Sequence, residues 1–158
     1  MDIYGKIIAL ILLLFLSGFF SSSETAFFSL SRIRLRKRKF RKDPGFKYVV
    51  KLLKTPGTFL TTVIIGNETV NIAISVVAAA LVYSLAGDIF SEKTLPLCSL
   101  AVTVPVLLLF GEIIPKTLAV KFSEQIARVD SYPLFLFSSV TVPFRRMLNG
   151  TAKIFIRF

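Results

Sequence analysis

The sequence predicts an all-α membrane protein with three transmembrane helices and additional basic juxtamembrane or interfacial helices. Of the 158 residues, 54% are apolar and only 18% are charged, and the apolar residues gather in long runs. A spanning helix needs about 20 mostly apolar residues, and the stretches 7–31, 58–85 and 95–119 meet that requirement. We expect one domain, 1–158, in which 32–57 and 120–158 are cytoplasmic juxtamembrane segments.

The first apolar run also has the character of a secretory signal core, so a cleaved leader is an alternative. The segment before it carries Asp2 and Lys6 and therefore has no net charge, and no clear small-x-small cleavage site follows. Since a signal peptide normally has both features, we favour a retained spanning helix.

The distribution of charge predicts the orientation of the helices. From Arg32 to Lys54 there are eleven lysines and arginines and one acid, Asp43, whereas the loop after the second span is mainly acidic. By the positive-inside rule, the N-terminus is outside and the C-terminus is cytoplasmic in a multi-pass protein of the cell membrane. Because the basic run directly follows a span and has few interleaved aromatics, we expect it to contact anionic lipid, with no nucleic-acid partner.

A fourth apolar run, from Tyr132 to Phe144, is too short to cross a bilayer. It has 13 residues with prolines near both ends. We interpret it as an interfacial or packed helix, and the amphipathic pattern of 142–148 and 152–158 indicates that the tail lies at the inner membrane surface.

Each predicted span contains one glutamate, namely Glu24, Glu68 and Glu112. Inserting a charged side chain at the bilayer centre costs at least about 2.5 kcal/mol of free energy. Each glutamate is therefore a candidate functional residue. At 1.5 Å of rise per residue, the three polar clusters lie roughly 10 to 16 Å from the cytoplasmic ends of their spans. We therefore expect the clusters to meet at a common depth.

The spacing within the spans supports a shared polar face. Asn67 and Asn71 are separated by four residues, as are Ser17 and Ser21, and residues at this spacing lie on one side of a helix. Proline at 115 removes one helical hydrogen bond and frees a carbonyl. Glycines at three further positions permit local irregularity: Gly18, Gly66 and Gly111.

The available ligands are oxygen donors. The chain has no histidine, and its single thiol, Cys98, lies near the outer end of the third span. Zinc, haem, disulfide and catalytic-triad chemistry are therefore disfavoured, and we expect no enzymatic activity. Hydroxyl, amide, carboxylate and carbonyl oxygens suit a hard cation such as Mg²⁺ or Na⁺.

Several polar residues also have a structural interpretation. Lys116 is four residues from Glu112 and could neutralise it, Asn71 could join helices without binding an ion, and Ser22 could bond to a backbone carbonyl. Glu24 could bond to a neighbouring helix, and Glu68 lies one residue off the face of Asn67. These alternatives stay open beside a second group of candidates for ion binding or gating: Ser17, Ser22, Glu24, Glu68, Pro115 and Lys116.

Three motifs resemble the transmembrane (DUF21) domain of the CNNM/CorC magnesium-transport proteins. They are GFFSSSETA at 18–26, IGNETVNI at 65–72 and FGEIIPKTLA at 110–119, and they occur in order over nearly the whole chain. The resemblance implies a homodimer with a belt of juxtamembrane helices and Mg²⁺ transport, often as Na⁺-dependent efflux. It also implies an ion site at Ser21, Ser23, Asn67, Asn71, Gly111 and Glu112.

The resemblance has two departures and one missing part. Ser22 replaces a frequent glycine, and Glu68 replaces a residue that is usually neutral. Family members usually continue into regulatory CBS-pair domains that bind ATP-Mg²⁺, and we expect these in the full-length protein. One alternative function is a Mg²⁺-sensing membrane anchor that does not move the ion. Another is a pore-forming lytic protein, which the basic inner loop and three long spans disfavour.

Overall fold

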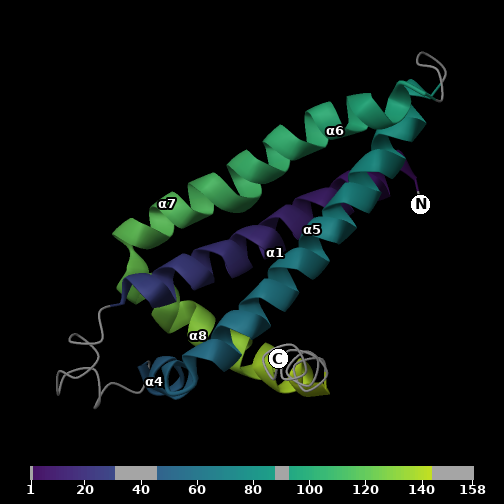
Figure 1. Ribbon diagram of the computed structural model, residues 1–158. Coiled ribbons are helices and arrows are strands. Elements are labelled where there is room, and N and C mark those ends of the chain that lie inside the picture. The colour runs from purple at the N-terminus through teal and green to yellow at the C-terminus, as the bar shows by residue number, and fades with distance from the viewer. Residues whose placement is uncertain (1, 31–45, 88–92, 144–158) are drawn as a thin grey trace, which may run out of the picture. The chain divides into compact units, whose positions relative to one another are not determined.

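The structure is a computed structural model that describes residues 2–30, 46–87 and 93–143. These residues are almost entirely helical and contain no strand, which confirms the predicted all-α class (Figure 1). The elements are α1 (Ile3–Ser29), α4 (Lys47–Leu53), α5 (Pro56–Ala86), α6 (Leu95–Val106), the π-helix η2 (Leu107–Ile113), α7 (Ile114–Lys121) and α8 (Ser123–Val140).

Three of the helical runs are long and apolar enough to cross a membrane: Ile3–Ser29, Pro56–Ala86 and Leu95–Lys121. They agree with the predicted spans to within four residues at each end. The first span begins earlier than predicted because the polar residues at its start continue the same helix. The direction in which the chain crosses the membrane stays a prediction.

The burial pattern of α1 is the reverse of that in a soluble helix. Large apolar side chains such as Ile8, Leu12 and Phe15 are exposed, whereas Ser17 and Ser21 are completely buried. Apolar side chains on the outside suit contact with lipid, and polar residues inside a membrane protein normally face a neighbouring helix or a cavity. The first span therefore turns its apolar side outwards and its serines inwards.

The chain forms two compact units, and we describe each by itself. Unit 1 comprises Met1–Ser22 and Gly66–Leu118, and unit 2 comprises Ser23–Ile65 and Ala119–Phe158. In unit 1, α1 and α5 are antiparallel neighbours, because contacts join Lys6 to Ser84 near one end and Ser17 to Asn71 further along. Lys6 also donates to the carbonyl of Ala80, at 3.2 Å.

The glycines of α1 and α5 permit close packing. A Cβ added to Gly66 would lie 2.4 Å from Cε1 of the Phe20 ring, and one on Gly18 would lie 3.2 Å from Cγ of Pro115. Both helices run through these glycines without interruption. The expectation of local irregularity is therefore wrong at Gly18 and Gly66, where a missing side chain brings helices together.

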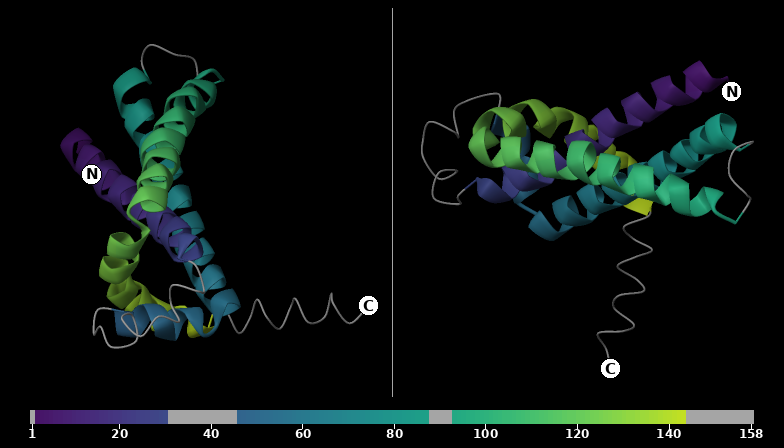
Figure 2. Two further views of the ribbon diagram at one scale, coloured as in Figure 1. Left: turned by 90° about the vertical axis from the view of Figure 1, so that its left-hand side faces the viewer. Right: turned by 90° about the horizontal axis from the view of Figure 1, so that it is seen from above.

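The third span is irregular, as its sequence predicts. Figure 2 shows it as one continuous helical run from α6 into α7, but its middle seven residues, Leu107–Ile113, form a π-helix. The N–H of Ile114 donates to the carbonyl of Leu109, five residues back. Because Pro115 has no N–H, the carbonyl of Gly111 has lost its α-helical donor. The expectation of irregularity at Gly111 is confirmed.

Unit 2 has an aromatic core. Phe27 stacks on Phe59 with ring centroids 4.5 Å apart, and both side chains are 1% exposed. Helix α4 packs against α8 through Tyr48, whose ring lies 5.3 Å from that of Tyr132 and 5.2 Å from that of Phe135.

Helix α8 begins nine residues before the predicted start at Tyr132 and contains Pro133 in its interior. Its buried side chains are Ala127, Asp130, Ser131 and Leu134, which have helical spacing. The prediction was wrong about the start because it followed a continuous apolar run and ignored this amphipathic pattern. The expected features of 31–45 and 144–158 lie outside the described residues.

Candidate functional site

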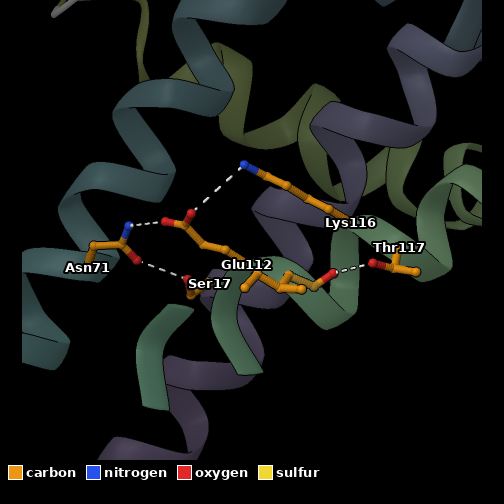
Figure 3. A network of polar contacts seen from close by, with 6 residues as sticks. Ser17, Asn71, Glu112, Lys116 and Thr117 are labelled. Carbon is orange, nitrogen blue, oxygen red and sulfur yellow. Dashed lines mark hydrogen bonds and ion pairs between the residues drawn. The ribbon is translucent and has the colours of Figure 1, made fainter. Parts of the chain in front are cut away.

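A polar cluster in unit 1 joins one residue from each of the three spans. The Ser17 hydroxyl of α1 donates to Oδ1 of Asn71 on α5 at 2.9 Å, and Nδ2 of Asn71 is 3.4 Å from Oε1 of Glu112 in η2 (Figure 3). The sequence predicted that polar groups of the three spans meet, and these contacts confirm it for Ser17, Asn71 and Glu112.

The second oxygen of Glu112 faces a cation from the same helical run. Nζ of Lys116 lies 3.9 Å from Oε2 of Glu112, so the expected pairing at four-residue spacing is present. The Glu112 side chain is 27% exposed and that of Lys116 is 43% exposed. A partly exposed ion pair of this length is weak, so the carboxylate remains available to another cation.

Three further oxygens in unit 1 are buried without a hydrogen-bond partner among the described residues: Oγ of Ser21, Oδ1 of Asn67 and, on α6, Oγ1 of Thr103. Ser21 lies one turn after Ser17, and Asn67 lies one turn before Asn71. Because α1 and α5 are antiparallel, both steps lead in the same direction from the Ser17–Asn71 bond. A buried oxygen left without a partner is costly, and a bound cation would satisfy those of Ser21 and Asn67.

Gly111 allows this packing. There is no room for a side chain at this position, because a Cβ would lie 2.9 Å from Oγ of Ser17 and 3.1 Å from Cδ1 of Leu107. Glycine at this point therefore lets η2 approach α1 closely enough for Glu112 to reach Asn71. The same approach places backbone of the π-helix beside the serine face of α1.

The remaining predicted residues have other surroundings. The Ser22 hydroxyl donates to the carbonyl of Phe19 at 3.1 Å, which confirms its structural interpretation. Ser23 is in unit 2, and its hydroxyl donates to Asp130. Glu68 is exposed on α5, and Glu24 is partly buried. Whether Ser23, Glu24 and Glu68 bind an ion stays a prediction.

Sequence reasoning missed Asp130. Its carboxylate accepts a hydrogen bond of 2.7 Å from Ser23, and the residue is only 8% exposed. Burial raises the pKa of the Asp130 carboxyl from its ordinary value of 3.8 to about 6, and the bond from Ser23 acts in the opposite direction. Asp130 could have been found from the helical spacing of Ala127, Asp130 and Leu134, because this spacing places the aspartate on an apolar face of the helix.

The polar atoms of the unit 1 cluster are all of one chemical kind, oxygen, apart from the nitrogens of Asn71 and Lys116. Its donors are hydroxyls, amide oxygens and a carboxylate, which suit Mg²⁺ or Na⁺ better than softer metals. The described residues contain no group of three or more histidine, cysteine or acidic side chains that could hold a metal ion. Hydroxyls and amides would therefore supply most of the ligands.

These features define a multi-pass membrane protein with an oxygen-lined polar site between its spanning helices. The chain belongs to the CNNM family, because the family model described as the cyclin M transmembrane N-terminal domain matches residues 7–158.

Relatives occur in bacteria and plants. The chain is 34% identical over 146 residues to a UPF0053 protein of Haemophilus influenzae and 32% identical over 142 residues to the UPF0053 inner membrane protein YfjD of Escherichia coli. It is also 37% identical over 146 residues to a chloroplastic DUF21 domain-containing protein of Arabidopsis thaliana. These matches cover 92%, 90% and 92% of this chain but only 34%, 32% and 21% of the relatives. The chain thus spans between 21% and 34% of their length.

Proposed function

We propose that the chain carries Mg²⁺ across the cell membrane and that the polar cluster of unit 1 binds the ion. The proposed ligands are Ser21, Asn67, Asn71, Gly111 and Glu112 from the first group of predicted residues, together with Ser17 from the second group, which bonds to Asn71. Membership of the CNNM family, which is linked to divalent-cation transport, supports the proposal.

The observation that carries the proposal is the pair of unpartnered oxygens, on Ser21 and Asn67, each one helical turn from the bond between Ser17 and Asn71. Oγ of Ser21 and Oδ1 of Asn67 have lost water without gaining a partner among the described residues. Membrane proteins retain such groups at a cost, usually for function. A cation held there would be bound by both oxygens and attracted by the charge of Glu112.

Lys116 has a gating role in this proposal. Its ammonium group occupies one side of the Glu112 carboxylate in the structure, at 3.9 Å. An arriving cation would compete with the ammonium for that oxygen, and departure of the cation would restore the pair. The free energy for net transport would come from an ion gradient, and we propose Na⁺-coupled efflux.

The partners are likewise proposals. Glu68 is exposed on a spanning helix, where contact with lipid would be costly, so a homodimer that covers this side of α5 is favoured. Lys47, Lys51 and Lys54 are exposed along one face of α4 and would contact anionic lipid. In the full-length protein we expect regulatory CBS-pair domains.

Flux measurements with Glu112→Gln test the proposal. Purified protein in liposomes that contain a Mg²⁺-sensitive dye should show Mg²⁺ movement, and the variant should lose it because the ion loses its charged ligand. Glu124→Gln on α8 removes a carboxylate outside the cluster and serves as the matched control. Equal flux from folded Glu112→Gln protein would refute the proposal, and Mg²⁺ binding without flux in the wild type would favour the sensor.

A further inference from the structure

The contact between Ser23 and Asp130 joins α8 to the first span and takes no part in the proposed ion site. Both side chains are buried, Ser23 completely, and the oxygen atoms are 2.7 Å apart. No lysine or arginine in the described ranges pairs with Asp130. A carboxyl group in such a place is costly, and an apolar residue would pack there at lower cost. The contact therefore calls for a benefit other than stability.

That benefit follows from the composition of α1. Residues 7–16 of α1 are all apolar, so rotation of this stretch about the helix axis exchanges one apolar face for another and changes little in contact with lipid. Directional hydrogen bonds distinguish one rotation from the others. Such bonds are made by Lys6 and Ser17 in unit 1 and by Ser23 in unit 2.

Helical geometry shows how two of these bonds act together. Each residue advances the helix by about 100°, so Ser17 and Ser21 lie roughly 40° apart on one face. Ser23 lies about 200° from Ser21, on the opposite side of α1. A bond on one side alone lets a helix roll about that contact, whereas bonds on two sides hold its rotation.

We propose that Asp130 is a positioning residue: by accepting the hydrogen bond from Ser23, it fixes the rotation of α1 and so keeps Ser17 and Ser21 directed into the ion-binding cluster. The inference rests on the proposed function for its effect on Mg²⁺. The rotation itself is independent of any ion.

Cross-linking measures the rotation without Mg²⁺. In a Cys98→Ala background, which removes the only native thiol, Ser17→Cys and Asn71→Cys place two thiols where the side chains now touch. A short bifunctional thiol reagent should join them rapidly. Asp130→Ala and, separately, Ser23→Ala should each slow the reaction at least about threefold, whereas Asp130→Asn, which still accepts a hydrogen bond, should restore the rate. Equal rates in all four proteins would overturn the proposal.

Titration calorimetry with Mg²⁺ then measures the consequence for binding. Loss of a group that orients a metal ligand typically weakens binding 10- to 100-fold, so we expect about a tenfold higher Kd for Asp130→Ala. Ser23→Ala should have the same effect, and the double variant should bind no more weakly than either single variant, because both changes remove one contact. Additive losses would show that Asp130 does not act through Ser23.

The two measurements separate the two proposals. Wild-type protein that fails to bind Mg²⁺ refutes the proposed function, but the cross-linking rates still decide whether Asp130 sets the rotation of α1. If Asp130→Ala binds Mg²⁺ normally and cross-links as fast as the background protein, the inference is overturned and the proposed function is unaffected.

Discussion

The carboxylates of Glu112 and Asp130 are both removed from bulk water, but their surroundings differ. Glu112 is 27% exposed and faces an amide on one oxygen and an ammonium group on the other. Asp130 is 8% exposed and faces one hydroxyl. Long, partly exposed contacts such as those of Glu112 are easily exchanged, whereas a short buried bond is not. The comparison teaches that exchangeable neighbours, more than burial, make a carboxylate suitable for a mobile ion.

Gly111→Ala should disturb the Glu112 region most. The new methyl group would approach Oγ of Ser17 to 2.9 Å and force that buried hydroxyl away from Asn71. Loss of one such bond costs about 1 to 3 kcal/mol, so calorimetry should show Mg²⁺ binding weaker by about tenfold or more. Gly57→Ala, with no atom within 4 Å of its Cβ position, is the matched control and should bind normally. Unchanged affinity in Gly111→Ala would contradict the assigned packing.

Asp130 should instead make the stability of the protein depend on pH. Burial raises the pKa of Asp130 to about 6 in the folded protein, from an ordinary value of 3.8. The folded state therefore binds the proton more tightly than the unfolded state, and stability falls as the pH rises from about 4 to about 6. Above about pH 6, where Asp130 is ionised in both states, the free energy of unfolding no longer changes with pH through this residue.

Thermal unfolding followed by circular dichroism checks this expectation. Relative to Asp130→Asn, which has no carboxyl at this position, the wild type should lose several degrees of midpoint between pH 4 and pH 7. Parallel curves for the two proteins over that range would show that Asp130 titrates as it does in the unfolded chain.

The smallest effect is expected from Lys116→Gln. The ion pair with Glu112 is long and partly exposed, and such pairs contribute about 0.5 kcal/mol. Removing the competing ammonium group should therefore tighten Mg²⁺ binding by about twofold, while Lys116→Arg should leave it unchanged. Weaker binding in Lys116→Gln would indicate that the lysine supports the site and does not compete with the ion.

The difference between the two carboxylates also explains what the sequence could predict. Glu112 stands inside a long apolar run, where an acid is conspicuous, and its estimated depth was similar to that of Asn67. Asp130 lies in a segment that also contains Glu124 and Arg128, so its charge alone does not indicate a buried position. Ser17 and Ser21 share a face, and only the packing around Gly111 determines which of them bonds to Asn71.

The wide turn of η2 has a mechanical consequence. A π-helical turn holds about one more residue than an α-helical turn, and this extra residue lies within Leu107–Ile113, the segment that contains Gly111 and Glu112. If the extra residue of the π-helix shifts by one position along the span, the side chain at the position that it leaves rotates by roughly 100° about the helix axis. The flanking helices α6 and α7 do not have to move. The third span can thus turn the Glu112 carboxylate towards Asn71 or away from it without sliding or tilting.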